Sequence, residues 1–105
     1  MKRIDTKYGR VRICSDHITI KANVEAVNEY ICDHDDGYDY ILDSVTTIKQ
    51  DEDGFWCVYE DYTFWSEQDE CWVRNLFKDG TVPCNYCTQT LLEAVYLAWC
   101  SLLDK

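Results

Sequence analysis

Alternating apolar and polar residues near the N-terminus predict a β-hairpin. Val11 and Ile13 alternate with arginines, and Ile18 and Ile20 alternate with polar residues in the same way. A period of two is typical of strands that bury one face. The intervening Ser15-Asp16 is a turn signal. We therefore expect two antiparallel strands at the start of the chain.

A helix is predicted directly after this hairpin. Val24, Val27 and Ile31 recur at spacings of three and four residues, which places them on one face of a helix. Asn23 precedes them and can accept a hydrogen bond from the first turn. Gly37 marks the far side of the helix.

Two runs rich in β-branched and aromatic residues, 40–49 and 55–65, predict a second hairpin. The residues between them end in Asp53-Gly54, a pair that tolerates positive φ and is a strong hairpin signal. A further strand is predicted over 71–77. At the start of that region Ser66 and Asp69 also fit a capping box, which leaves a short helix as the alternative there.

The clearest helix lies near the C-terminus, where apolar residues recur at helical spacing: Leu91, Val95, Ala98, Trp99 and Leu102. Thr88 and Thr90 are both candidate caps, and Pro83 interrupts any strand that precedes the helix. The predicted order is strand, strand, helix, three strands, helix. This order predicts a single α+β domain over residues 1–105, with an antiparallel sheet of about five strands and both helices on one face.

Composition indicates a folded chain that is neither exported nor embedded in a membrane. Apolar residues make up 47% of it, too many for a disordered acidic chain. The N-terminus lacks the apolar run of a secretory signal, and no segment is apolar enough to span a membrane. Seven cysteines, an odd number at irregular spacings, favour reduced thiols. We expect a cytoplasmic protein.

Four of the cysteines lie in apolar stretches, so we predict that they are buried: Cys14, Cys32, Cys57 and Cys100.

Charge is distributed unevenly along the chain, whose net charge is −10. Residues 1–21 hold six Lys or Arg against two acids, whereas residues 33–70 hold thirteen acids against Lys49 alone. These acids fall at predicted loops and turns, where carboxylates stay ionised without desolvation. They are the candidate partner-binding residues: Asp33, Asp35, Asp36, Asp39, Asp43, Asp51, Glu52, Asp53, Glu60, Asp61, Glu67, Asp69 and Glu70.

An acidic surface of this kind repels nucleic acid and can occupy a groove built to bind it. Aromatic residues are interleaved with the acids, and those that are exposed would serve as interface anchors. The simpler interpretations are a solvated face that only confers solubility, and aromatic rings that mostly fill the core. The rings in question are Tyr38, Tyr40, Phe55, Trp56, Tyr59, Tyr62, Phe64 and Trp65.

Cys84-Asn85-Tyr86-Cys87 is the one short motif with chemical content, since two thiolates at this spacing can share a zinc ion or form a redox pair. A zinc site needs two more ligands, for which the candidates are Cys71, Cys57, His17 and His34. None of them forms a second compact pair. We therefore expect no metal and no cofactor.

Other chemistry has weaker support in the sequence. Residues 33–39 resemble a calcium loop only superficially, because the glycine is one position early and Ser44 stands where the twelfth-position glutamate belongs. Neither His17 nor His34 lies in a catalytic signature, and the four glycines form no phosphate loop. We therefore expect no catalytic residues and no enzyme activity.

In size, acidity and lack of catalytic motifs the chain resembles the small proteins that phages encode to block host defences, including anti-restriction and anti-CRISPR inhibitors. The resemblance implies an inhibitor that acts in the host cytoplasm and mimics nucleic acid. Its partner would be a larger, basic nucleic-acid-binding protein, with no direct contact to nucleic acid or to a membrane. The alternative is a structural or regulatory domain that self-associates as a homodimer, with zinc bound through Cys84 and Cys87 as a further variant.

Overall fold

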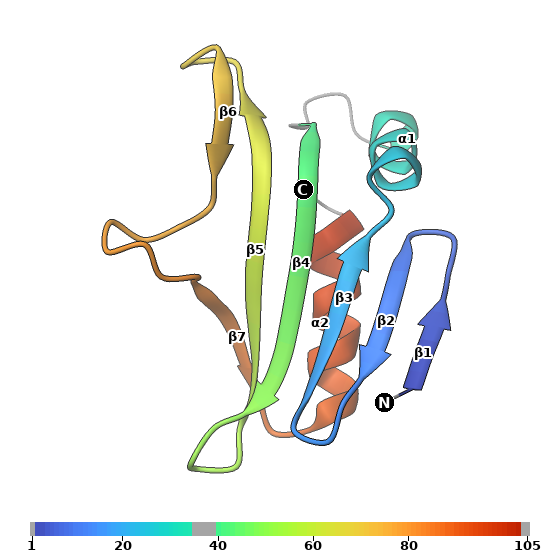
Figure 1. The fold of residues 1–105 in the computed structure, drawn as a ribbon, viewed down its shortest axis with the longest axis vertical. Coiled ribbons are helices and arrows are strands. Elements are labelled where there is room, and N and C mark those ends of the chain that lie inside the picture. The colour runs from blue at the N-terminus through green and yellow to red at the C-terminus, as the bar shows by residue number, and fades with distance from the viewer. Residues whose placement is uncertain (1, 35–39, 104–105) are drawn as a thin grey trace.

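The computed structural model describes residues 2–34 and 40–103 (Figure 1). Its elements are β1 (Lys2–Asp5), β2 (Gly9–Ile13), β3 (His17–Ala22), α1 (Val24–His34), β4 (Ile41–Gln50), β5 (Trp56–Ser66), β6 (Cys71–Arg74), β7 (Cys84–Thr88) and α2 (Leu91–Leu103). An antiparallel sheet with two helices confirms the predicted α+β class.

The strands form one antiparallel sheet in the order β1-β2-β3-β4-β5-β6. Strand β7 pairs with the same edge of β5 as β6 does, but with a different part of it (Figure 1). Strand β6 pairs with Thr63–Ser66, whereas β7 pairs with Trp56–Tyr59. As a result, β5 is paired along nearly all of both edges.

Both helices pack on one face of the sheet, and the core lies between them and the strands. Because side chains alternate along a strand, every second residue of β3, β4 and β5 enters this core. The buried apolar residues form one cluster: Ile18, Ile20, Val27, Ile31, Ile41, Ile48, Val58, Ala94, Ala98 and Leu102. The opposite face of the sheet is not covered by a helix, and we call it the open face.

Side-chain caps begin both helices, as the sequence predicts. Asn23 Oδ1 accepts a hydrogen bond from the backbone N–H of Ala26 at 3.4 Å. Thr90 Oγ1 accepts one from the backbone N–H of Glu93 at 3.2 Å. Thr90 is therefore the N-cap of α2. The side chain of Thr88, the other candidate, bonds instead to the carbonyl oxygen of Thr90.

Helix α1 is tied to the start of β4 by one amide side chain. Asn28 Nδ2 donates to the carbonyl oxygen of Ile41 at 2.9 Å, and Asn28 Oδ1 accepts from the N–H of the same residue at 3.0 Å. The pairing of β4 with β5 shifts register between Ile41 and Asp43. The amide thus satisfies both backbone groups of a buried residue that lies at an irregularity of the ladder.

The tip of the β4–β5 hairpin is a short turn closed by Asp51. Its Oδ1 accepts the backbone N–H groups of Asp53 at 3.0 Å and of Phe55 at 2.9 Å. Gly54 has a φ of +88°, in the left-handed region that glycine enters without steric cost. The Asp-Gly signal is therefore confirmed.

The structure adds β1 and β7 to the predicted strands and shortens the strand predicted over 71–77 to Cys71–Arg74. The short-helix alternative is wrong, because residues 67–70 form a turn. Ser66 Oγ nevertheless accepts the N–H of Asp69 at 3.2 Å, as in the first half of a capping box. Here the hydrogen bond from Asp69 N–H to Ser66 Oγ stabilises a turn instead of a helix, because strand β6 begins directly after it.

The predicted burial of four cysteines holds in part. Cys57 is buried and Cys14 and Cys100 are half-buried, but Cys32 is exposed on α1. Neither helix in the described part of the chain is long and apolar enough to cross a membrane. Gly37, predicted to follow α1, lies outside the described residues.

Candidate functional site

Six of the exposed carboxylates in residues 33–70 lie at the two ends of β5. The hairpin tip before β5 carries Asp51, Glu52 and Asp53, and the turn after it carries Glu67, Asp69 and Glu70, all exposed. Figure 1 shows these two turns at opposite ends of the sheet. Strand β5 has 11 residues. At about 3.3 Å per residue it spans roughly 36 Å. The acidic segment is therefore two separate patches, which we call the tip patch and the turn patch.

The remaining predicted acids lie elsewhere. Asp33 is exposed on the last turn of α1 and Asp43 is exposed on β4. Asp35, Asp36 and Asp39 lie outside the described residues, as does most of the loop that superficially resembles a calcium site.

Glu60 corrects the prediction that all of these acids are exposed. It is 1% exposed, because its position in β5 turns its side chain toward the helices, opposite Thr46 of β4. Asn85 Nδ2 donates to Glu60 Oε2 at 2.7 Å. A carboxylate held inside the fold does not meet a partner, so Glu60 is not a candidate contact.

Asp61 is half-buried and bound to Arg74 of β6 by two hydrogen bonds, of 2.9 and 2.6 Å. The hydrogen bonds from Arg74 hold the pKa of the Asp61 carboxyl below its usual range. This acid is thus partly neutralised, and it contributes to the fold rather than to a free acidic surface.

The Asp61–Arg74 pair predicts a specific dependence of stability on pH. In an unfolded chain the pKa of an Asp carboxyl is about 3.9, and in the fold the pKa of Asp61 is lower. The ion pair therefore stabilises the fold fully at pH values above the unfolded pKa. This stabilisation is lost as the pH falls through the lowered folded pKa. We expect Arg74→Gln to be less stable than the parent at neutral pH, and the difference to vanish in acid. Urea unfolding over a pH series measures it; a difference independent of pH would contradict the assignment.

Positive charge lies on the opposite edge of the sheet from β5. Arg10 and Arg12 of β2 and Lys21 of β3 are exposed, and alternation places them on the open face, since their neighbours enter the core. Lys49 of β4 stands over the ring of Tyr59, 4.8 Å from its centroid. The molecule therefore has a basic edge at β1–β3 and acidic patches at the ends of β5.

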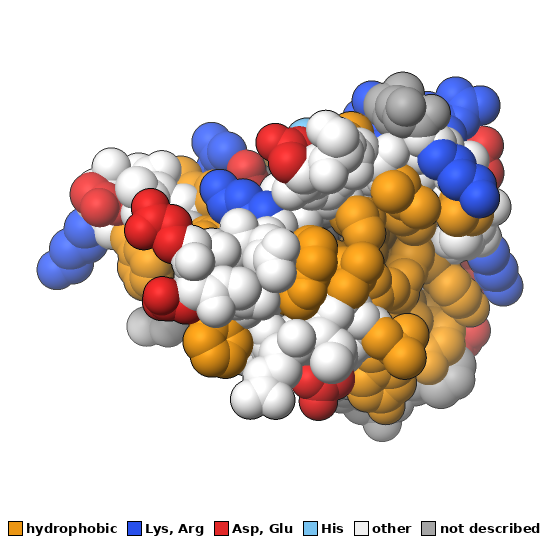
Figure 2. All heavy atoms as spheres, turned by 90° about the horizontal axis from the view of Figure 1, so that it is seen from below, with side chains coloured by type: hydrophobic (Ala, Val, Ile, Leu, Met, Phe, Trp, Pro, Cys, Tyr) orange, Lys and Arg blue, Asp and Glu red, His pale blue; other side chains and the backbone are white. Residues whose placement is uncertain are grey.

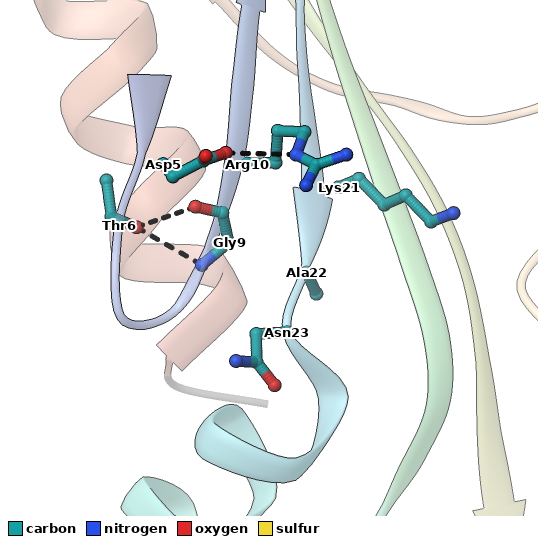
Figure 3. A pocket seen from close by; sticks show the side chains of 7 residues that line it. All are labelled: Asp5, Thr6, Gly9, Arg10, Lys21, Ala22 and Asn23. Atoms are coloured by element: carbon teal, nitrogen blue, oxygen red, sulfur yellow. Dashed lines mark hydrogen bonds and ion pairs between the residues drawn. The ribbon is translucent and has the colours of Figure 1, made fainter. Parts of the chain in front are cut away.

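A pocket of about 350 Å³ opens at the β1–β2 turn on this basic edge (Figure 3). Arg10 Nε donates to Asp5 Oδ1 at 2.9 Å, and Thr6 Oγ1 donates to the carbonyl oxygen of Gly9 at 2.8 Å. A Cβ at Gly9 would lie 2.8 Å from the carbonyl oxygen of Lys21, so only glycine fits there. With its arginine paired and its threonine bonded to backbone, the pocket offers no set of convergent groups for a ligand.

An apolar groove of about 530 Å³ runs between α2 and the first three strands. Figure 2 shows hydrophobic side chains gathered in this hollow. Val95, Trp99 and Leu103 line it from the helix. Farther round α2, Leu92 is 81% and Tyr96 67% exposed, so this helix lacks the polar outer face of an ordinary surface helix.

Most of the interleaved aromatic residues are partly covered. Tyr40 and Phe55 are exposed, whereas Trp56, Tyr59, Tyr62, Phe64 and Trp65 are half-buried. Tyr38 lies outside the described residues. Sequence alone did not point to Trp72, which is exposed on β6 and stacks edge-on against Trp65 at 5.4 Å between ring centroids. Phe55 thus lies beside the tip patch and Trp72 beside the turn patch, whereas Phe77 and Tyr96 are exposed elsewhere.

Three cysteine sulfurs converge beside the tip patch. Register places Cys57 of β5 opposite Cys87 of β7, and their sulfurs are 3.4 Å apart. Cys84 Sγ is 3.6 Å from Cys87 Sγ, and all three sulfurs lie within 4.8 Å of one another. Asp51 Oδ2 is 3.7 Å from Cys57 Sγ. The sequence indicated Cys84 and Cys87 as a pair, and the sheet adds Cys57.

The surroundings of these thiols differ from those of a redox pair. Cys84 and Cys87 lie in strand β7 and not at the N-terminus of α2, which begins at Leu91. Burial, and then the neighbouring Cys87 thiol, raises the pKa of Cys57 to about 12. Partial burial and Cys87 also raise the pKa of Cys84. A reactive thiol needs a lowered pKa, so these surroundings do not favour a redox pair.

The other zinc-ligand candidates lie apart from this cluster. Among the described residues, the group of side chains placed to hold a metal contains neither Cys71 nor His17. His17 Nδ1 instead lies 2.7 Å from Asp16 Oδ1 at the start of β3. The side chain of His34 lies outside the described residues.

Comparison with protein-family models, curated proteins and solved structures finds no match.

Proposed function

We propose that this chain is a protein-binding inhibitor that places its acidic patches on the basic nucleic-acid groove of a larger enzyme and blocks it. The spacing of the patches carries the proposal. They are separated by the roughly 36 Å length of β5. One helical turn of duplex DNA is about 34 Å long, so two patches at this distance resemble phosphates one turn apart.

The distribution of the other charges supports this orientation. None of the ion pairs between described residues involves the carboxylates of either patch, so their charge is available to a partner. Six of the ten Lys and Arg residues belong to residues 1–21, at the far edge of the sheet, where they would not oppose docking, and Arg74 beside β5 is paired with Asp61. Long-range attraction between unlike surfaces speeds encounter and is weakened by salt. In this proposal the protein is a non-enzymatic, phage-type anti-defence inhibitor in the host cytoplasm.

The proposal is tested by capture followed by inhibition. The tagged full chain is incubated with bacterial lysate, washed at low salt, and eluted first with duplex DNA and then with high salt. We expect mass spectrometry to identify a nucleic-acid enzyme in the DNA eluate. The purified enzyme should then lose DNA binding as the chain is added. An enzyme that is captured but binds DNA unchanged would overturn the proposal.

The exposed apolar surface of α2 favours a second candidate, a domain that self-associates through this helix. A helix that is apolar on its outer side normally has a partner. We expect sedimentation over a concentration range to detect a dimer that Leu92→Lys converts to monomer. The control is Leu42→Lys, which places lysine at an exposed leucine of β4. A parent chain that stays monomeric at all concentrations would remove this candidate.

A further inference from the structure

We infer that Cys57, Cys84 and Cys87 form a zinc site, with Asp51 as its fourth ligand. The site joins β5, β7 and the tip of the β4–β5 hairpin. The inference does not depend on the proposed inhibitor function, since it rests on the geometry of the three sulfurs and of Asp51, the one residue that the site shares with the tip patch.

The sulfur positions suit a tetrahedral metal. Zinc–sulfur bonds are about 2.3 Å long, which places two sulfurs of a tetrahedral site about 3.8 Å apart. Two of the sulfur separations, 3.4 and 3.6 Å, are slightly shorter than this value, and the third pair lies within 4.8 Å. Side-chain shifts of up to about one ångström, within the freedom of a cysteine χ1 angle, would bring all three sulfurs to one ion.

The backbone holds the three cysteines in this arrangement. Cys57 and Cys87 are directly opposed in the ladder, and a register shift between Val58 and Tyr59 brings Cys84 to the same place. Cys84 and Cys87 are exposed, although free cysteine is among the most buried residue types. The exposed thiols of Cys84 and Cys87 therefore contribute little to stability through apolar burial, but a metal ion can reach them from solvent.

Asp51 is oriented to complete the site. Its Oδ1 is engaged by two backbone N–H groups of the hairpin tip, which leaves Oδ2 beside Cys57 at 3.7 Å. In a tetrahedral zinc site a carboxylate oxygen and a sulfur are about 3.5 Å apart. Asp51 contacts Cys57 but lies outside the group of atoms within 4.8 Å of one another, so its side chain must turn toward Cys84 and Cys87 to bind the ion.

Such a site would be structural, because four protein ligands leave no open position. It would fix β7 and the hairpin tip to each other, although the two are more than thirty residues apart in the chain. Binding would also release thiol protons, since zinc is held by thiolates. Metal affinity should therefore fall as the pH is lowered.

The test uses the purified, reduced full chain with Co²⁺ and Zn²⁺ as probes. We expect one ion per chain, the intense visible bands of tetrahedral thiolate-bound cobalt, displacement of cobalt by zinc, and a higher melting temperature with metal. Cys84→Ser and Cys87→Ser, at exposed positions, should each weaken binding about a hundredfold or more. Asp51→Asn should weaken it about tenfold while the thiolate bands persist.

Cys71→Ser is the matched control, because it removes an exposed cysteine outside the cluster and should leave binding unchanged. Circular dichroism of each apo variant establishes that it folds. The inference is overturned by substoichiometric metal, by the weak spectrum of octahedral cobalt, or by an equal loss in the control. A Cys84–Cys87 disulfide that forms under the same reducing conditions, detected by mass, would overturn it as well.

Discussion

Replacing Asn28 with Ala is expected to lower the free energy of unfolding by about 2–4 kcal/mol, because it leaves two buried backbone groups without partners. Those groups are the N–H and the carbonyl of Ile41, which is 1% exposed. Urea unfolding measures the loss. Faster hydrogen exchange at the Ile41 amide would locate it at the junction of α1 and β4.

Two further variants separate this effect from a general weakening of α1. Asn28→Asp keeps the acceptor for the Ile41 N–H but has no donor for the carbonyl, so an intermediate loss is expected. Glu29→Ala alters the neighbouring exposed residue of the helix and should change stability by under about 0.5 kcal/mol. If Asn28→Ala and Glu29→Ala are equally stable, apolar contacts alone hold α1 on the sheet.

Asn28 also illustrates where prediction from the sequence ended. The two helices and the strands β2 to β5 were predicted because each has an apolar face with its own period, written locally in the residues. The contact between Asn28 and Ile41 joins residues thirteen apart through a loop. No local pattern marks an amide that pairs with backbone across such a distance.

The two strands that were missed lie at edges. Strand β1 reads Lys-Arg-Ile-Asp and is exposed throughout, so it has no buried face to give a period. Strand β7 follows Pro83 directly, and its pairing comes from backbone hydrogen bonds to β5. Backbone pairing is independent of side-chain type, which is why the sequence did not predict these strands.

The same reason explains what the sequence left open or got wrong at the candidate sites. Cys57 was one of four candidate partners for Cys84 and Cys87, and only the register of β7 on β5 brings it beside them. Glu60 was grouped with exposed acids because its neighbours are acidic, but strand alternation turns it inward. The charge of the segment could be read from the sequence, but the side on which each carboxylate lies could not.

Neutralising the acidic patches is expected to weaken binding to the captured enzyme ten- to a hundredfold at low salt, mainly through slower association. The triple variant is Glu52→Gln, Asp53→Asn and Glu67→Gln. Asp51 is left intact, because it closes the hairpin turn. The melting temperature should barely change, since exposed substitutions alter stability little. Surface plasmon resonance at several salt concentrations measures the rates.

The matched control removes the same number of charges elsewhere: Glu25→Gln, Glu29→Gln and Glu93→Gln, all exposed on the helices. Both triples reduce the net charge from −10 to −7. Equal weakening by the two would mean that net charge acts without regard to position. No weakening by either would exclude charge as the basis of binding and favour the self-associating domain.

Variants of one patch at a time test whether β5 acts as a spacer between two contacts. Glu52→Gln with Asp53→Asn alters the tip patch, and Glu67→Gln with Glu70→Gln alters the turn patch. If both patches lie in one groove, each double variant loses part of the binding free energy, and because the patches are far apart the losses add in the combined variant. If one double variant loses everything and the other nothing, a single patch makes the contact. The resemblance of β5 to one turn of DNA then has no role, although inhibition by the remaining patch would persist.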